Sequence, residues 1–433
     1  MSAVTQAPQA PAVTPASTKT TDCIVNTIEA IKASSVVSKA RLLKVPTESE
    51  PLQVVVIHGD PTKPNSILPG GKWDEDDFYT IERLREALTA LKKYSFKILC
   101  NHDTLFDDLR LLKQQNRVDL VLQLCDEGFM NNSRMELHVV ALLEVLEIPF
   151  TGIGPKLMGM TYDKQCILKV AESIGVPVPK SIFIEEGDSY DPKDYGMLYP
   201  VIVKPNSTDG SFGITAKNVC SSLEQLHEAV SQIRNIFHIR GPILLQEYLT
   251  GRDVNVGVME KWDPNTKQYE PWVLPISEED YSALPEGLPK ICGFESKWDE
   301  SSPYYKIQTR PTTLSPEMQE KVGQWTKRLF KRIECRDYGR FDWRLDGQGN
   351  PRLLEANPNC GWCWDGHLPK TASLCGILYP RFFEMILESA WHRAERLAQL
   401  KDEDKHHTFI QVQRNGAEQL YKPTSTQSTN GER

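Results

Sequence analysis

The stretch from Tyr338 to Gly361, YGRFDWRLDGQGNPRLLEANPNCG, carries the pattern on which the fold depends. Residues 338–345 and 351–357 each alternate between two kinds of side chain, and the DGQGN segment between them is dense in turn-forming residues. The pattern predicts a β-hairpin, in which successive side chains point to opposite faces. A surface hairpin with charged outward positions is the plain alternative.

Alternation places the charged residues of the hairpin together. On the first strand we expect one face to hold Arg340, Asp342 and Arg344. On the second strand the predicted faces are Leu353, Glu355 and Asn357, against Leu354 and Ala356. A loop with an even number of residues would bring Asp342 opposite Glu355. Two carboxylates and an amide oxygen suit Mg²⁺, and the metal would remove the repulsion between the like charges.

Composition limits the class of protein. At 433 residues the chain is long enough for two or three domains. A formal net charge of −8 argues against a general nucleic-acid partner, and no apolar run is long enough to span a membrane. The first twenty residues lack a signal or transit pattern, and the ten cysteines are scattered. We therefore expect a cytoplasmic protein with reduced thiols.

The first half of the chain alternates strand and helix patterns. We expect a disordered tail at 1–22, a helix from Cys23 to about Ser38 and an α/β domain at 51–150, whose alternation implies a parallel sheet. No G-x-G-x-x-G follows its first strand, so a dinucleotide site is not supported. The predicted strands are Leu52–Ile57, Phe96–Cys100 and Leu120–Leu124, and the predicted helices Phe78–Tyr94, Leu105–Gln115 and Met135–Leu146.

Two further domains are predicted at 151–248 and 249–400, followed by a disordered tail at 401–433. Residues 260–315 show no regular pattern and are predicted to be irregular. The predicted helices are Asp163–Ile174, Leu223–Ile236, Met318–Arg332 and Ile377–Arg396, and the predicted strands Val201–Pro205, Ile243–Tyr248 and Val254–Met259.

Lys204 ends an apolar strand, and the polar loop 206–213 with two glycines follows it. A lysine is rarely buried without an anionic neighbour, and a glycine-containing loop can turn its N–H groups toward phosphate oxygens. A lysine that extends from the strand end into solvent is the alternative. The loop is not a Walker A sequence, because no Gly-Lys-Ser/Thr follows.

The order of these motifs resembles the ATP-grasp superfamily, and most of all its D-alanine–D-alanine ligase branch. The motifs are Asp163-Lys164, a strand with Lys204-Pro205, the 206–213 loop, Gln246-Glu247-Tyr248, Arg340-x-Asp342 and LLEAN at 353–357. They cover residues from about 120 to about 395. The resemblance implies an α/β (α+β) ATP-grasp fold with an N-terminal Rossmann-like parallel-sheet domain.

The resemblance also implies a role for each matching residue. Lys164 and Lys204 would contact the α- and β-phosphates of ATP, and the loop with Gly210 and Ser211 would cover the γ-phosphate. The adenosine part would be bound by Gln246, Glu247, Leu249, Asp253, Ile202 and Leu354. Two Mg²⁺ (or Mn²⁺) ions would be held by Asp342, Glu355 and Asn357. The catalytic set would be Arg340, Lys297 and Ser211.

The implied activity is that of an ATP-dependent carboxylate–amine ligase, which forms an amide or peptide bond through an acyl phosphate. Its partners would be small carboxylates and amines, and a homodimer is considered as its assembly. Two alternatives stay open: a non-catalytic ATP-binding or regulatory protein, and an ATP-grasp kinase that only phosphorylates its substrate.

The amino-acid sites depart from the branch. The family's Gly-Gly-x-Ser-x-Glu motif is replaced by His58-Gly59-Asp60-Pro61, and its His-Gly loop by CDEG at 125–128. Glu127, Arg134 and Glu136 lie near this second change, and Gly210 stands where the family has the first of two serines. After the hairpin, CGWCWDGH at 360–367 replaces small hydroxyl residues. Two tryptophans and an acid imply a bulkier or differently charged acceptor, and therefore other substrates than D-alanine.

Cys360 and Cys363 allow two further interpretations. A redox C-x-x-C pair should open a helix in a thioredoxin-like unit, and this pair instead follows the predicted metal-binding strand. With His367 and Cys375 the pair could bind zinc. Packing within a substrate loop is the favoured interpretation.

Overall fold

The computed structural model describes residues 45–65 and 69–415, with only the course of the helix given from 401 onward. The tail predicted at 1–22, the helix predicted from Cys23 to about Ser38 and residues 416–433 lie outside the described residues. Residues Pro46–Arg433 form one compact unit, which is described by itself here.

A parallel sheet of three strands confirms the predicted Rossmann-like element. Its order is β2-β1-β3, with β1 at Leu52–Ile57, β2 at Tyr94–Leu99 and β3 at Leu120–Gln123. Nearly all of the β1 and β3 side chains are buried, as expected where helices cover both faces of a parallel sheet. The loops after β1 and β3 leave the same edge of the sheet, so they lie side by side.

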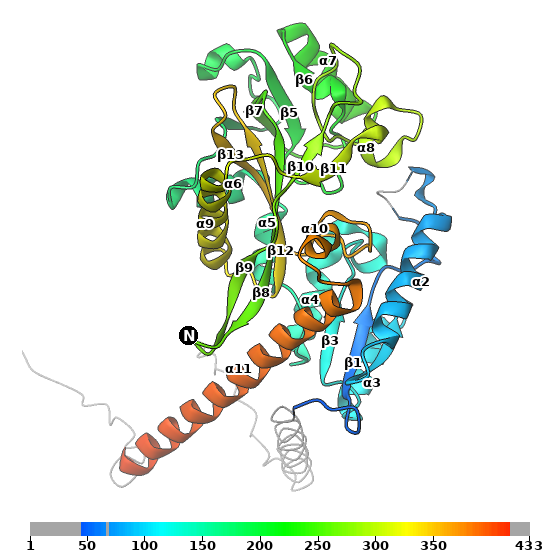
Figure 1. Ribbon diagram of the computed structural model, residues 1–433, viewed down its shortest axis with the longest axis vertical. Helices are drawn as coiled ribbons and strands as arrows, with labels where there is room; N and C mark the ends of the chain where they lie inside the picture. Colours follow the sequence, from blue (N-terminus) through cyan, green and yellow to red (C-terminus); the bar gives the residue numbers. More distant parts are fainter. Residues whose placement is uncertain (1–44, 66–68, 416–433) are drawn as a thin grey trace, which may run out of the picture. The chain divides into compact units, whose positions relative to one another are not determined.

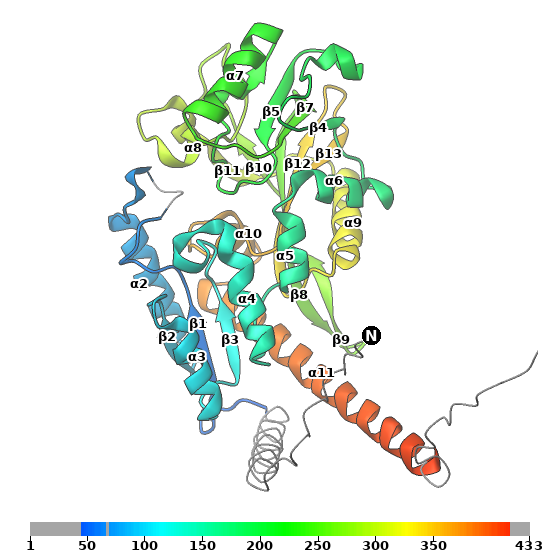
Figure 2. The same ribbon diagram turned by 180° about the vertical axis from the view of Figure 1, so that it is seen from behind.

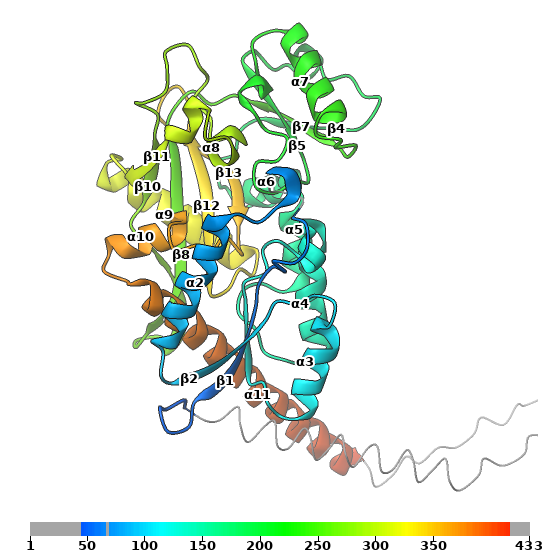
Figure 3. The same ribbon diagram turned by 90° about the vertical axis from the view of Figure 1, so that its right-hand side faces the viewer.

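Helices flank this sheet (Figure 3). α3 (Leu105–Gln114) and α4 (Glu136–Val145) share a core with Val55 and Ile57, whereas α2 (Glu75–Thr89) lies on the opposite side. Asp74 caps α2 by accepting hydrogen bonds from the N–H groups of Asp76 and Asp77. These helices begin or end within a few residues of their predicted positions.

A four-stranded antiparallel sheet has the order β4-β7-β5-β6. Its strands are β4 (Ser181–Ile184), β5 (Val201–Pro205), β6 (Val219–Cys220) and β7 (Ile243–Glu247). α7 (Leu223–Asn235) packs against the face that carries Val201 and Val203. Because side chains alternate along β5, Ile202 and Lys204 point away from α7.

The third sheet has six antiparallel strands in the order β11-β10-β8-β12-β13, with β9 paired to β8 (Figures 1 and 2). Its strands are β8 (Asp253–Asp263), β9 (Gln268–Val273), β10 (Ser277–Asp280), β11 (Gln308–Pro311), β12 (Tyr338–Leu345) and β13 (Pro351–Asn357). The prediction that 260–315 is irregular is wrong, because β9, β10, β11 and α8 (Glu295–Trp298) lie there. The sequence of β10 shows no apolar pattern, because its buried residues are the polar Ser277, Glu278 and Glu279.

The predicted hairpin forms from β12 and β13, with the turn at 346–350. Trp343 lies opposite Leu353, the register then shifts, and Asp342 lies opposite Glu355. Leu354 is the extra residue of this β-bulge, which offsets the odd number of residues in the turn. The prediction that Leu353 shares a face with Glu355 is wrong: Leu353 is fully buried in the core that contains Phe341 and Trp343.

The remaining helices complete the described part of the chain. They are α5 (Pro155–Thr161), α6 (Lys164–Ser173), α9 (Pro316–Arg332), α10 (His367–Leu374) and α11 (Tyr379–Asn415), together with 3₁₀ turns η1 (Pro69–Gly71), η2 (Phe129–Asn131), η3 (Ser133–Met135), η4 (Pro192–Tyr195), η5 (Ala216–Asn218) and η6 (Pro303–Lys306). α11 continues past residue 401, where the sequence predicted a disordered tail. Within the described ranges, no helix has both the length and the apolar character needed to cross a membrane.

The strands of each sheet fall within one predicted domain range, 51–150, 151–248 or 249–400. The division of the chain into these domains stays a prediction.

Candidate active site

One cleft lies between the four-stranded and the six-stranded sheet. Its empty space is about 1190 Å³, part of it open to solvent, which is ample for a nucleotide. All the site residues predicted from the sequence line it: Lys164, Ile202, Lys204, Gly210, Ser211, Gln246, Glu247, Leu249, Asp253, Lys297, Arg340, Asp342, Leu354, Glu355 and Asn357. Segments almost 200 residues apart in sequence therefore meet at one place.

Lys204 reaches the cleft from β5. Its Nζ donates a hydrogen bond of 3.0 Å to Oε1 of Gln246 on β7, whose Nε2 in turn donates to Ser181 Oγ at 2.9 Å. Burial lowers the pKa of Lys204 to about 8, and Glu355 opposes this shift only in part. The lysine thus points into the cleft and not into bulk solvent, and it is ready to accept an anion.

Lys164 stands at the first position of α6. Asp163 caps this helix by accepting a hydrogen bond of 2.8 Å from the N–H of Cys166. Lys164 Nζ lies 2.5 Å from Glu355 Oε1 and donates at 2.8 Å to the carbonyl of Thr208. Burial alone would lower the pKa of Lys164, but the attraction of Glu355 outweighs it and raises the pKa.

Arg340 neutralises the other carboxylate of the hairpin. Its Nε and Nη2 bond to the two oxygens of Asp342 at 2.7 and 2.9 Å, and Asn357 Nδ2 donates to Asp342 Oδ2 at 2.9 Å. Burial tends to raise the pKa of Asp342, yet the charge and hydrogen bonds of Arg340 keep it below the ordinary value. Each carboxylate of the hairpin is therefore paired with a cation of the protein.

The oxygen ligands Asp342, Glu355 and Asn357 fit a hard divalent cation, because their carboxylate and amide oxygens are the type that Mg²⁺ prefers. In the described part of the chain no three His, Cys, Asp or Glu side chains are grouped as a metal site. This finding excludes a grouped zinc site formed by Cys360, Cys363, His367 and Cys375.

The loop after Lys204 is held against α8. Gly210 and Ser211 adopt left-handed backbone angles, with φ of 60° and 61°. Ser211 Oγ donates to the carbonyl of Cys292 at 3.3 Å, and Trp298 Nε1 donates to the carbonyl of Gly210 at 3.4 Å. The loop is thereby connected to the helix that carries Lys297.

Arg344 is a site residue to which the sequence assigned no role. Its Nη1 donates to Asp253 Oδ2 at 2.8 Å and its Nε to the carbonyl of Leu249 at 2.6 Å, and the hydroxyl of Tyr281 also donates to Asp253. The alternation along β12 contained the signal, since Arg344 stands two residues after Asp342 on the same face. Other polar cleft residues to which the sequence assigned no role in nucleotide binding include Asn255, Glu279 and His367.

A second pocket adjoins the cleft and shares Lys164, Lys297, Arg340, Glu355 and Asn357 with it. Its other end is acidic, with Asp126, Glu127 and Glu136. We call this end the acid pocket. Arg134, which the sequence placed near these residues, is exposed and does not line the pocket.

The three carboxylates of the acid pocket accept hydrogen bonds from neutral donors. Glu136 accepts from the hydroxyl of Tyr162 at 2.8 Å, Glu127 from the N–H of Gly59 at 3.1 Å and Asp126 from Trp362 Nε1 at 3.2 Å. Among the described residues, none of the three forms an ion pair within 4.0 Å. Burial raises the pKa of Asp126 to about 6 and those of Glu127 and Glu136 well above the ordinary value.

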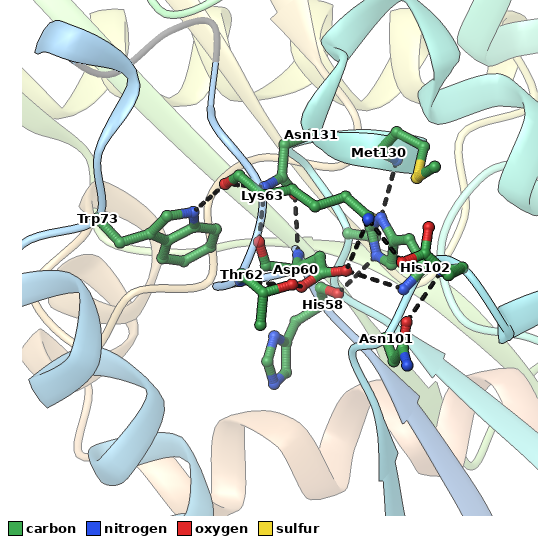
Figure 4. A network of polar contacts seen from close by, with 11 residues as sticks. His58, Asp60, Thr62, Lys63, Trp73, Asn101, His102, Met130 and Asn131 are labelled. Atoms are coloured by element: carbon green, nitrogen blue, oxygen red, sulfur yellow. Dashed lines mark hydrogen bonds and ion pairs between the residues drawn. The ribbon is translucent and has the colours of Figure 1, made fainter.

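Asp60, the acidic residue of the loop after β1, forms hydrogen bonds to nearby residues of the fold (Figure 4). Asp60 accepts from Thr62 Oγ1 at 2.7 Å and from the N–H of His102 at 3.0 Å, and its N–H donates to Asn131 Oδ1 at 2.8 Å. The N–H of Met130 donates to His102 Nδ1 at 2.8 Å, so the proton of this ring is on Nε2, which donates to the carbonyl of His58 at 3.1 Å. Glu127, and not Asp60, is therefore the acid of this region that lines the second pocket.

Cys360 and Cys363 line the second pocket beside these acids. Burial raises the pKa of both thiols, whereas a redox C-x-x-C pair requires a lowered one. The nine cysteines that the structure describes form no disulfide. Packing remains the favoured interpretation of the pair.

Known proteins resemble the chain over most of this region. Residues 170–388 match the family described as "D-ala D-ala ligase C-terminus". The uncharacterized protein y4sG of Sinorhizobium fredii is 29% identical over 62% of this chain and 73% of its own length. The D-alanine–D-alanine ligase of Haemophilus influenzae is 28% identical over 57% of this chain and 76% of its own.

A solved structure shows the same fold. The D-alanine–D-alanine ligase of Bacillus anthracis, crystallised with ATP, superimposes with a TM-score of 0.58 at 20% identity, covering 80% of this chain and 99% of that one. The predicted ATP-grasp fold is thereby confirmed.

The fold and the matching family define an ATP-dependent ligase that forms C–N bonds. The chain belongs to the D-alanine–D-alanine ligase family, whose matched segment spans half of it. ATP, a divalent metal and small-molecule substrates are general features of this family.

Proposed function

We propose that the protein phosphorylates a carboxylate with ATP and joins the resulting acyl phosphate to an amine, with substrates other than D-alanine. The observation that carries this proposal is the continuity of the two pockets. They share Arg340, Lys297 and Lys164, so a nucleotide in one and an amino acid in the other would meet at these cations.

The nucleotide would lie along the cleft, with its phosphates toward Lys164, Lys204 and the loop of Gly210 and Ser211. Gln246, Glu247 and Leu249 would bind the adenine edge, Asp253 the ribose, and Ile202 and Leu354 the two faces of the ring. Positioning and charge neutralisation are the main requirements of phosphoryl transfer, and these residues supply both.

Asp342, Glu355 and Asn357 would hold two Mg²⁺ or Mn²⁺ ions. Bound metal would neutralise phosphate charge and orient the γ-phosphate. The carboxylates are already paired with Arg340 and Lys164, at 2.7 and 2.5 Å. With a metal held by these carboxylates, Arg340 and Lys164 would be free to bind phosphate and acyl-phosphate oxygens.

Arg340 and Lys297 would act where negative charge develops, on the transferred phosphoryl group and on the oxyanion formed when the amine attacks. A preorganised donor at such a position contributes about 3 kcal/mol. Ser211 would cap the γ-phosphate from the loop and help to exclude water from the acyl phosphate.

The acid pocket supports a change of substrate. The carboxylate next to the β1 loop comes from Glu127, the Asp60 carboxylate is occupied within its own loop, and buried thiols stand after the hairpin. A methyl side chain would leave most of this acidic surface without a partner.

The test is ATP-dependent phosphate release across a panel of amino acids and carboxylic acids, with mass spectrometry of the products. We expect ADP, phosphate and an amide in equal amounts. A stable phosphate ester without amide would identify a kinase, and turnover by D-alanine alone at a rate typical of an enzyme would refute the proposed change of substrate.

A further inference from the structure

Acidic side chains gather in the second pocket: Asp126, Glu127 and Glu136 of the acid pocket line it together with Asp77 and Asp209. Asp126 and Glu127 follow β3, and Glu136 begins α4. Asp126 and Glu127 are neighbours in the chain, and burial together with the charge of Asp126 raises the pKa of Glu127. Carboxyl groups that are close together repel when both are ionised, so the arrangement is costly unless a cation or a proton compensates it.

Among the described residues, no lysine, arginine or histidine forms an ion pair with Asp126, Glu127 or Glu136. The pocket's cations are Lys164, Lys297 and Arg340, all shared with the cleft, and two of them are already paired with Glu355 and Asp342. The four phosphate charges of ATP would add further demand for these cations. Positive charge for the acid pocket must therefore come with the substrate.

The lining of the second pocket is apolar in part. It includes Ile153 and Met158, whose side chains are almost fully buried. Aliphatic surface at this position suits a chain of methylene groups, which would lie between the reacting carboxylate near Arg340 and a charged group at the acid pocket.

We propose that the substrate of the second pocket is a diamino acid, with an aliphatic side chain that ends in a second ammonium group. The inference rests on the proposed function and names the substrate class of that same site. One α-ammonium group can neutralise one carboxylate, whereas a second ammonium group would give another of these acids a partner. Asp126, Glu127 and Glu136 are then the residues that determine specificity.

Hydrogen-bond donors with further contacts of their own fix the positions of Asp126 and Glu136. Trp362 Nε1 donates to the carbonyl of Leu124 at 2.7 Å as well as to Asp126, and Asn359 Nδ2 donates to Glu136 at 3.4 Å. Asn359 Oδ1 also accepts from the N–H of Ile153 at 3.3 Å. The acids are thus fixed by residues that immediately follow the metal-binding strand.

The test is calorimetric binding to the full chain with Mg²⁺ and a non-hydrolysable ATP analogue. Lysine and ornithine, each as both enantiomers, are compared with norleucine and norvaline, which have the same carbon chain without the second ammonium group. We expect one diamino acid to bind at least about tenfold more tightly than its neutral counterpart. Equal or tighter binding of the neutral counterparts would overturn the proposal.

Substitutions in the acid pocket test whether its carboxylates cause the preference for diamino acids. Glu136→Gln and Asp126→Asn should each reduce the diamino acid preference about tenfold and leave binding of the ATP analogue unchanged. Glu144→Gln, on the exposed side of the same helix α4, is the matched control and should keep the preference. A preference that survives both acid variants would refute the assignment of these residues.

Measurements of binding and of turnover distinguish a failure of the diamino acid proposal from a failure of the ligase proposal. If neutral amino acids are coupled to amides as well as diamino acids are, the substrate inference fails and the ligase proposal stands. If a diamino acid binds selectively but no amide forms with any partner of the panel, the ligase proposal fails and the specificity of the pocket stands.

Discussion

Glu355 lies directly opposite Asp342 in the β12–β13 pair, although the turn between the strands has an odd number of residues. The extra residue, Leu354, absorbs the difference. As a consequence Leu354 and Glu355, which are neighbours in the chain, both line the cleft, while Leu353 is buried in the core. The bulge thus brings an apolar side chain and a carboxylate, the predicted metal ligand Glu355, to the same side of one strand.

This geometry predicts opposite effects for two adjacent leucines. Leu353→Ala should lower the free energy of unfolding by about 2–5 kcal/mol, because it leaves a cavity beside Phe341 and Trp343. Leu354→Ala should change it by less than about 1 kcal/mol but weaken binding of an ATP analogue roughly tenfold. Urea denaturation and calorimetry measure the two quantities, and equal effects of both substitutions would contradict the bulge.

The carboxylate pair predicts the metal requirement. Asp342→Asn and Glu355→Gln should each lower turnover at least about 100-fold and weaken Mn²⁺ binding, measured by electron paramagnetic resonance with the ATP analogue present. Asp346→Asn is the control, because Asp346 bonds within the turn to Asn350 and Arg352 and does not line the cleft. Unchanged Mn²⁺ binding in both hairpin variants would place the metal elsewhere.

Arg340 is expected to act in the chemical step. Arg340→Gln should lower kcat about 100-fold, which corresponds to about 3 kcal/mol, with a smaller effect on the KM for ATP. The loss of its charge should also raise the pKa of Asp342, so Mn²⁺ binding should require a higher pH than in the parent protein. A change confined to KM would show that Arg340 serves binding alone.

Lys204 predicts a pH dependence. Its pKa is about 8 because it is buried, so the empty cleft loses this positive charge as the pH rises through that value. Bound phosphate would favour the protonated lysine, so nucleotide binding takes up a proton and the affinity falls above pH 8, by up to about tenfold per pH unit.

Calorimetry between pH 7 and 9 checks this expectation. Lys204→Arg should remove the decline, because arginine stays charged throughout the range. A constant affinity in the parent protein would show that Lys204 does not face phosphate.

Trp362 is expected to act through Asp126. Trp362→Phe keeps an aromatic ring beside His58 but removes the hydrogen bonds to Leu124 and Asp126. The KM for the amino acid should rise several-fold while the KM for ATP stays the same. A parallel rise in both would indicate a general loss of structure.

The sequence predicts those elements whose signals lie within a few neighbouring residues. The valine-rich strand at Leu52–Ile57, the turn after Leu345 and the lysine at the end of β5 follow from apolar runs and turn residues within a few positions. The order of the motifs along the chain then indicated which residues would form the site, and all of them line the cleft.

Other features have no local signature. The buried side chains of β10 include Glu278 and Glu279. Their ion-pair partners Arg252, Arg310 and His367 are distant in sequence. The bulge at Leu354 depends on the count of turn residues and on packing beneath the sheet. The acid pocket brings Asp126 and Glu136 together, with Asn359 bonded to Glu136, and neither spacing nor periodicity connects these three positions.

The hydrogen bonds of Asn359 and Trp362 have a consequence for protein engineering. The short loop after β13, the strand with the predicted metal ligands, donates hydrogen bonds to Glu136 and Asp126 of the proposed amino-acid pocket. The proposed catalytic and recognition regions are therefore not independent modules. A chimera that imports residues 51–150 from a relative with another preference would keep a loop shaped for the old ligand. Grafts should therefore exchange that region together with residues 358–366.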